Sequence, residues 1–116
     1  MKFKLIVVLV NDRHTETVVR TAREAGATGS TVVASARGTG LHPVKTFLDL
    51  EFEGQRDVIL LLVEEHLSRH ILENIGDVCR FDENPGNGIA FRIDIEDVVG
   101  LASQLETISS EIEGMI

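Results

Sequence analysis

Residues 57–63 read DVILLLV, and residues 3–10 read FKLIVVLV. Each is a short apolar run that lacks the alternation of polar and apolar residues found in a strand with one face in water. Each therefore predicts a strand that is buried on both faces. Two further apolar runs, Ser30–Ala36 (STVVASA) and Ile89–Ile95 (IAFRIDI), bring the expected number of strands to about four.

Stripes of apolar residues at helical spacing follow three of these strands. The first stripe predicts a helix that Asp12 can cap and that Gly26 ends as the residue after the C-cap; it comprises Val18, Val19, Ala22 and Ala25. The second comprises Leu67, Ile71, Leu72, Ile75 and Val78. A third predicts a C-terminal helix over Glu96–Ile112, with its stripe at Val98, Leu101, Ala102, Leu105, Ile108 and Ile112.

The order of elements is β-α-β, a long connection, β-α-β and a final helix. When the sequences of the two halves are aligned at a constant offset, Ile6 matches Ile59 and Val10 matches Val63. This order predicts an α+β, ferredoxin-like βαββαβ sandwich with a four-stranded antiparallel sheet and an extra C-terminal helix. The length of 116 residues fits one domain over 1–116. A doubly wound fold is the alternative, but it needs more helices.

The first and third strands are central in a ferredoxin-like sheet, and helices cover only one of its faces. Because Leu5–Val10 and Val58–Val63 do not alternate, the second face must also be buried. A symmetric partner is the simplest way to bury it, so we expect an oligomer. The alternative is that the C-terminal helix folds over this face.

The charge is distributed unevenly along the chain. The net charge is −8, yet residues 1–45 carry 7 Lys/Arg against 3 Asp/Glu, and residues 46–116 carry 4 against 16. The acidic part argues against binding to nucleic acid or to an anionic membrane surface, whereas the basic part leaves room for a small anion. No run is long enough to insert into a membrane, so a cytoplasmic protein is expected.

Two glycine clusters are candidates for anion binding. Arg37-Gly38-Thr39-Gly40 follows the second strand, and Pro85-Gly86-Asn87-Gly88 precedes the fourth. Successive backbone N–H groups in such turns can cradle a phosphate. A dinucleotide-binding motif is excluded because no helix opens after Gly40. Taken alone, two tight turns explain these clusters more simply.

Other chemistry-bearing residues give weaker signals. His66 and His70 have the spacing that places two imidazoles on one helix face, but no third metal ligand lies near them in the sequence. Cys79 is expected to be a small buried apolar residue. No nucleophile–base order and no pair of carboxylates indicates a catalytic site, so we expect no enzyme. A small enzyme with its site on the open sheet face is disfavoured because the central strands carry no polar residues there.

The segments AGATGSTVVASARGTG (25–40) and GNGIAFRIDIEDVVGL (86–101) resemble the PII-type nitrogen-regulatory and PII-like signalling proteins. The resemblance implies a homotrimer with adenine nucleotides in the clefts between subunits. It also implies a regulatory T-loop at 39–56, chiefly Thr39–Gly54, that contacts a target such as a membrane transporter or an enzyme. The implied contact residues are Phe47, Leu48, Leu50 and Phe52.

The same resemblance implies a set of ligand-binding residues: Arg37, Gly38, Thr39, Gly40, His42, Gly86, Asn87, Gly88 and Arg92. The chain also departs from the family pattern. Leu41-His42 replaces Arg-Gln, Asn87 replaces Asp, and Ile89 replaces a phosphate-binding Lys. The loop has no Tyr to modify, and the C-terminal arginines of the family are absent.

Because charge-assisted contacts contribute about 1.5–3 kcal/mol each, these losses favour ADP, AMP or a cyclic nucleotide over ATP as the effector. The basic residues left to replace them are Arg37, Lys45, Arg80 and Arg92. The sequence therefore predicts a non-enzymatic PII-like regulator. The alternative is a trimeric CutA-type protein that binds a divalent metal through His66 and His70.

Overall fold

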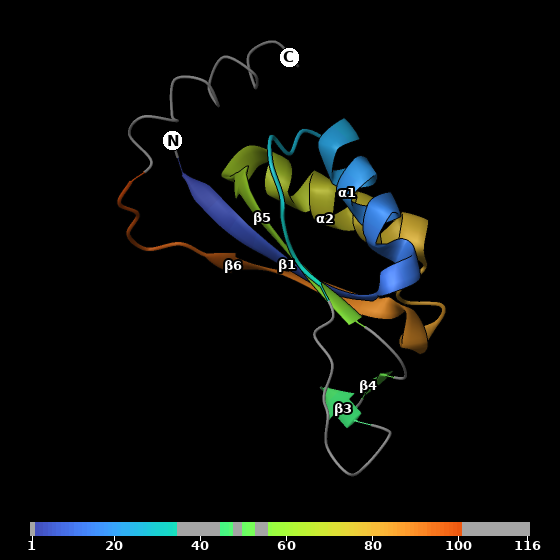
Figure 1. The fold of residues 1–116 in the computed structure, drawn as a ribbon. Helices are drawn as coiled ribbons and strands as arrows, with labels where there is room; N and C mark the ends of the chain where they lie inside the picture. Colours follow the sequence, from blue (N-terminus) through green and yellow to red (C-terminus); the bar gives the residue numbers. More distant parts are fainter. Residues whose placement is uncertain (1, 35–44, 48–49, 53–55, 101–116) are drawn as a thin grey trace.

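The main sheet has the strand order β2-β5-β1-β6, and every neighbouring pair is antiparallel. The computed structural model describes residues 2–34, 45–47, 50–52 and 56–100. The strands of this sheet are β1 (Phe3–Asn11), β2 (Thr31–Val33), β5 (Arg56–Glu64) and β6 (Gly88–Asp94). A separate hairpin consists of β3 (Lys45–Phe47) and β4 (Leu50–Phe52) (Figure 1).

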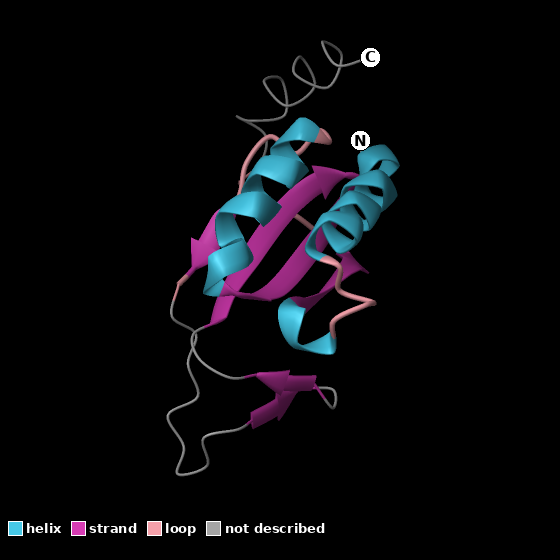
Figure 2. Cartoon of the chain, turned by 90° about the vertical axis from the view of Figure 1, so that its right-hand side faces the viewer, coloured by secondary structure: helices cyan, strands magenta, loops and turns pink. Residues whose placement is uncertain are grey.

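Two α-helices, α1 (Thr15–Glu24) and α2 (Glu65–Cys79), lie side by side on one face of the sheet (Figure 2). Two short 3-10 turns precede α1 and β6, namely η1 (Asp12–His14) and η2 (Pro85–Asn87). β1 and β5 are the central strands, and each has a neighbouring strand on both sides. This confirms the four-stranded antiparallel, ferredoxin-like α+β arrangement expected from the sequence.

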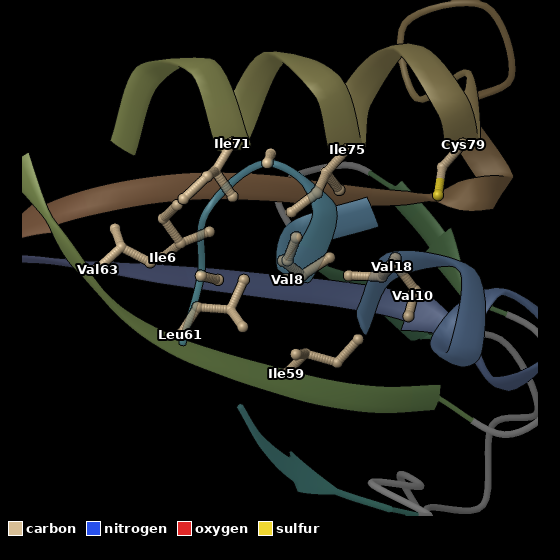
Figure 3. Close-up of a cluster of buried hydrophobic side chains, with 13 residues drawn as sticks. Ile6, Val8, Val10, Val18, Ile59, Leu61, Val63, Ile71, Ile75 and Cys79 are labelled. Carbon is tan, nitrogen blue, oxygen red and sulfur yellow. The ribbon is translucent and has the colours of Figure 1, made fainter. Parts of the chain in front are cut away.

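The core lies between the helices and the sheet (Figure 3). Alternate residues of the central strands point into it and are fully buried: Ile6, Val8, Val10, Ile59 and Leu61. The helices contribute fully buried side chains from the opposite side: Val18, Ile71 and Ile75. Burying such side chains contributes about 1.5–3 kcal/mol each, so this layer holds the helices on the sheet.

The opposite sheet face is apolar as well, but no helix of the described residues covers it. Register places the remaining residues of β1 and β5 on this face, because partners in antiparallel strands share a face. Leu5 pairs with Leu62 and Val7 with Leu60, and all four are only partly buried. The central strands therefore lack alternation, as expected, because both of their faces are apolar.

The end of each helix follows local rules. Gly26 follows the C-cap of α1 with a φ of +119°, as its sequence position predicts. The expected cap Asp12 instead lies within η1, and the side chain of Asn11 accepts the hydrogen bond from the N–H of Arg13. Arg80 ends α2 in the left-handed conformation, with a φ of +54°.

The apolar stripe of α2 differs from the prediction at its end. Val78 is 54% exposed, whereas Cys79 is buried. Cys79 continues the spacing of four residues set by Ile71 and Ile75, so it faces the sheet, while Val78 lies about 100° away around the helix. Burial of Cys79 agrees with its expected role as a small apolar residue.

The predicted C-terminal helix does not begin at Glu96. Residues 95–99 have no regular secondary structure, and Gly100 has a φ of +88°, which a right-handed helix does not contain. Val98, the first residue of the expected stripe, is 45% exposed, so it is not part of the buried core. The rest of the predicted helix, 101–112, lies outside the described residues.

Within the long connection, β3 and β4 pair in an antiparallel hairpin with Phe47 opposite Leu50. The backbone of β4 lies near η2, as Figure 1 also shows. No helix in the described part of the chain is long and apolar enough to cross a membrane.

Candidate functional site

Several connections lie at one end of the sheet, where strands begin or finish. β1 ends at Asn11, whose partner Arg56 begins β5, and Gly88 at the start of β6 pairs with Val10. β2 runs towards the same end of the sheet and finishes at Val33, which pairs with Val58. This end of the sheet therefore contains the β1–α1 junction, the turn before β6, the end of β2 and the start of β5.

Gly88 fits the turn before β6 because it has no side chain. Its φ of +148° and ψ of −172° lie in a region used almost only by glycine. A Cβ atom there would lie 2.3 Å from the carbonyl oxygen of Leu9 and 3.1 Å from the Cα of Val10. Gly88 thus lets the turn lie directly against the backbone of β1.

Side-chain and backbone hydrogen bonds hold the rest of this turn. The Nδ2 of Asn87 donates to the carbonyl oxygen of Cys79 at 2.8 Å, which ties the turn to the end of α2. The N–H of Asn87 donates to the carbonyl oxygen of Asn84 at 2.9 Å, and the N–H of Asn84 donates to that of Arg80 at 3.0 Å. Gly86 is exposed and has open space around its Cα.

An open pocket of about 530 Å³ lies between η1 and η2. The described residues that line it are Arg13, His14, Asn84, Gly86 and Asn87. The Nε of Arg13 donates to the Nε2 of His14 at 3.4 Å. The pKa of His14 lies below its ordinary value because burial disfavours the charged ring and because Arg13 repels a second positive charge.

Sequence reasoning missed Arg13 and His14 as site residues. The signal that could have found them is topological. In an antiparallel pair, residues just after the first strand lie beside residues just before the second. The pairing of Val10 with Gly88 therefore places the Arg13-His14 pair beside the glycine turn.

The other basic residues considered as phosphate partners have different surroundings. The Nη1 of Arg92 donates to the Oγ of Ser68 at 2.8 Å, and Arg92 lies four residues along β6 from Gly88. The Nε of Arg80 lies 3.7 Å from the Oε2 of Glu83. Ile89 pairs with Leu9, so its side chain lies on the open sheet face.

The remaining predicted ligand residues, 37–40 and 42, lie outside the described residues. Of the predicted contact residues, Phe47 ends β3, Leu50 and Phe52 bound β4, and Leu48 lies outside the described residues. The structure therefore describes only the half of the candidate site that β6 and its turn provide.

His66 and His70 on α2 are the residues that the metal-binding alternative invokes. The Nδ1 of His66 lies 3.1 Å from the Oε1 of Glu64, and the Nε2 of His70 lies 3.5 Å from the Nδ2 of Asn74. Among residues 2–34, 45–47, 50–52 and 56–100, no group of three potential ligands is close enough to hold a metal ion.

Several solved structures that share this fold are PII-like proteins. One is CPII from Thiomonas intermedia K12 bound to ADP, AMP and acetate, which is 23% identical with a TM-score of 0.60 over 87% of this chain and 96% of that one. Another is CPII bound to ADP, AMP and bicarbonate, which is 23% identical with a TM-score of 0.61 over 82% of this chain and 87% of that one.

A putative PII-like signaling protein from Thermus thermophilus is 22% identical, with a TM-score of 0.56 over 82% of this chain and 90% of that one. None of the curated proteins is significantly similar in sequence. The sequence pattern of the family described as Nitrogen regulatory protein P-II, however, matches residues 3–104. The chain therefore belongs to the nitrogen regulatory protein P-II family.

Proposed function

We propose that this chain is a single-domain, non-enzymatic regulatory protein of the cytoplasm. It binds an adenine nucleotide or a similar small anion in clefts between the subunits of a homotrimer. The connection over 39–56 then acts as a T-loop that contacts a target protein. The observation that carries the proposal is the hydrogen-bonded glycine turn at Gly86–Gly88, held at the end of the sheet where β2 ends and β5 begins.

The trimer is supported by the two glycine clusters and by the open sheet face. β2 and β6 are the two outer strands of the sheet, three strand spacings or about 14 Å apart. A cluster that follows β2 and a turn that precedes β6 can flank one ligand more easily when they come from neighbouring subunits. Packing of the apolar open faces against one another would place such edges side by side.

The nucleotide is supported by the shape of the turn and by the related structures. Short glycine turns allow a phosphate to approach the backbone closely. CPII structures with the same fold contain ADP and AMP. We therefore include Gly86, Asn87 and Gly88 in the proposed ligand site, together with the predicted residues Arg37, Gly38, Thr39, Gly40, His42 and Arg92.

The response of the T-loop is a shift between its conformations, so the nucleotide must bind one conformation more tightly than the other. The position of β4 near η2 supports this coupling, because a ligand at the turn also lies near the loop. The proposed target contacts are Phe47, Leu48, Leu50 and Phe52. The proposed target itself is a membrane transporter or an enzyme.

Calorimetric titration of the protein with ATP, ADP, AMP and cyclic dinucleotides tests the ligand. We expect heat from at least one adenine nucleotide and tighter binding of ADP or AMP than of ATP. The absence of heat with all of them would contradict the proposed ligand class. Addition of Zn²⁺ or Cu²⁺ is expected to leave the melting temperature unchanged, which separates this function from the metal-binding alternative.

Light scattering after size-exclusion chromatography tests the trimer. Leu60 lies on the open face and is partly buried, so Leu60→Glu should yield monomers or unfolded protein. Val78→Glu is the matched control, since Val78 is also apolar but is 54% exposed on α2. A monomeric wild-type protein would contradict the proposed assembly, and so would a Leu60→Glu variant with the mass of the trimer.

A further inference from the structure

We infer that Arg13 and His14 form, together with η2, a subsite for a phosphate-type dianion. The subsite itself does not depend on the proposed function. Only its assignment to the phosphate tail of a nucleotide rests on that function.

The first observation that supports the inference is the placement of charge. η1 and η2 lie beside each other at the end of the β1–β6 pair, where the segment entering α1 meets the orange turn before β6 (Figure 1). Arg13 is the cation of the pocket, and no acidic residue is among the described residues that line it. The pocket therefore has a positive wall opposite a backbone turn that accepts close approach at Gly86.

The second observation that supports the inference is the set of available hydrogen-bond donors. The Nδ2 of Asn87 is already bonded to the carbonyl oxygen of Cys79, so this side chain forms a fixed wall. The Nε2 of His14 accepts from Arg13, so the neutral ring carries its proton on Nδ1 and can donate it. With the remaining N–H groups of the Arg13 guanidinium and the side-chain amide of Asn84, these donors match the several oxygen atoms of a phosphate or sulfate.

The Arg13-His14 contact also shows why an anion would be favoured. The two basic groups lie 3.4 Å apart, and protonation of His14 would bring two like charges together. A dianion in contact with both groups would offset this repulsion and favour the charged ring. The charged groups beside them are Asp12 on η1 and, before η2, Asp82 and Glu83, of which Glu83 is paired with Arg80.

The volume of about 530 Å³ is larger than one phosphate needs. The same dianion chemistry can therefore come from a free inorganic ion or from the end of a nucleotide tail. Two arms of one experiment separate these sources. Both arms use the full chain, with Arg13→Ala as the test variant and Arg20→Ala as the control.

Arg20→Ala is a matched control because it removes the same charge from an exposed side chain on α1, away from the residues that line the pocket. Arg13 is exposed too, so neither variant should disturb folding. Circular dichroism of both variants verifies this before binding is measured.

The first arm measures sulfate binding through the histidine ring signals in NMR, at constant ionic strength. Sulfate does not titrate near neutral pH, so changes in the ring reflect the protein. We expect sulfate to shift the His14 signals and to raise the pKa of His14 in wild type and in Arg20→Ala. In Arg13→Ala the affinity for sulfate should fall roughly tenfold.

The second arm measures ADP and adenosine by calorimetry. If the nucleotide tail occupies the subsite, Arg13→Ala weakens ADP binding roughly tenfold and leaves adenosine unchanged. If sulfate binding depends on Arg13 but ADP binding does not, the subsite holds a free anion. If neither sulfate nor ADP depends on Arg13, the inference is wrong. A wild-type protein that binds sulfate through Arg13 but no nucleotide would contradict the proposed function and leave the subsite intact.

Discussion

Replacement of Gly88 by alanine is the sharpest test of how the glycine turn is built. The φ of +148° and ψ of −172° would cost a residue with a Cβ about 1–3 kcal/mol. The new atom would also lie 2.3 Å from the carbonyl oxygen of Leu9, so β1 or the turn must move. Overpacking of this kind costs about 1–3 kcal/mol.

The two costs add to about 2–6 kcal/mol, against a total stability of about 5–15 kcal/mol for a domain of ordinary stability. Gly86→Ala in the same turn provides the control. A Cβ at Gly86 meets nothing within 4 Å, and Gly86 is not among the described glycines with positive φ. Because alanine restricts the unfolded chain, Gly86→Ala should be neutral or stabilise by about 0.4–1 kcal/mol.

Urea unfolding followed by far-UV circular dichroism measures both variants, since the chain has no Trp or Tyr for fluorescence. With a urea dependence of about 1.5 kcal/mol/M, the midpoint of Gly88→Ala should fall by roughly 1–4 M. All samples need the same protein concentration, because assembly contributes to apparent stability. A midpoint for Gly88→Ala equal to that of Gly86→Ala would refute the argument that close approach to β1 requires this glycine.

Three further predictions concern single side chains. Thr15→Val should lower the free energy of unfolding by about 1–2 kcal/mol, measured by urea unfolding, because the Oγ1 of Thr15 donates to the carboxylate of Asp57, which is 7% exposed. The pKa of Asp94 lies below its ordinary value, first because Lys4 donates a hydrogen bond to it and then because of the Lys4 charge, so Lys4→Met should raise it in a carboxyl NMR titration. The stability that this pair adds is present above the ordinary carboxyl pKa and is lost as pH falls through the lowered one, so wild type and Lys4→Met should converge in acid. Cys79 is 3% exposed, and burial raises the pKa of its thiol, so a thiol reagent should label it only after denaturant is added; rapid labelling of the folded protein would contradict its burial.

The fold was predictable because its strongest signals are local. The apolar runs at 3–10 and 57–63 became β1 and β5, each slightly longer than its run, and both occupy the centre of the sheet. Errors arose where neighbours in space decide the outcome. Val78 fits an apolar stripe by spacing, but the sheet meets the helix at Cys79 instead.

The candidate site was only half predictable for the same reason. The glycine turn is visible in the sequence because Pro85, Gly86 and Gly88 are unusual residues in a short segment. Arg13 and His14 carry no such signal, since a basic pair at a strand end is common on protein surfaces. Their position beside the turn depends on the register of β1 with β6, which only the three-dimensional arrangement supplies.

The rigidity of the turn limits how the proposed switch can work. Gly88 lies against β1, and Asn87 is bonded to the end of α2, so core elements fix the turn on both sides. A ligand held by this turn alone would bind every loop conformation equally and could shift none of them. Any regulatory effect must therefore come from contacts that the ligand makes with the connection over 39–56 in one conformation only. Variants of Arg13 should then change ligand affinity while leaving the ratio of loop conformations at saturation unchanged, whereas variants within 39–56 should change that ratio.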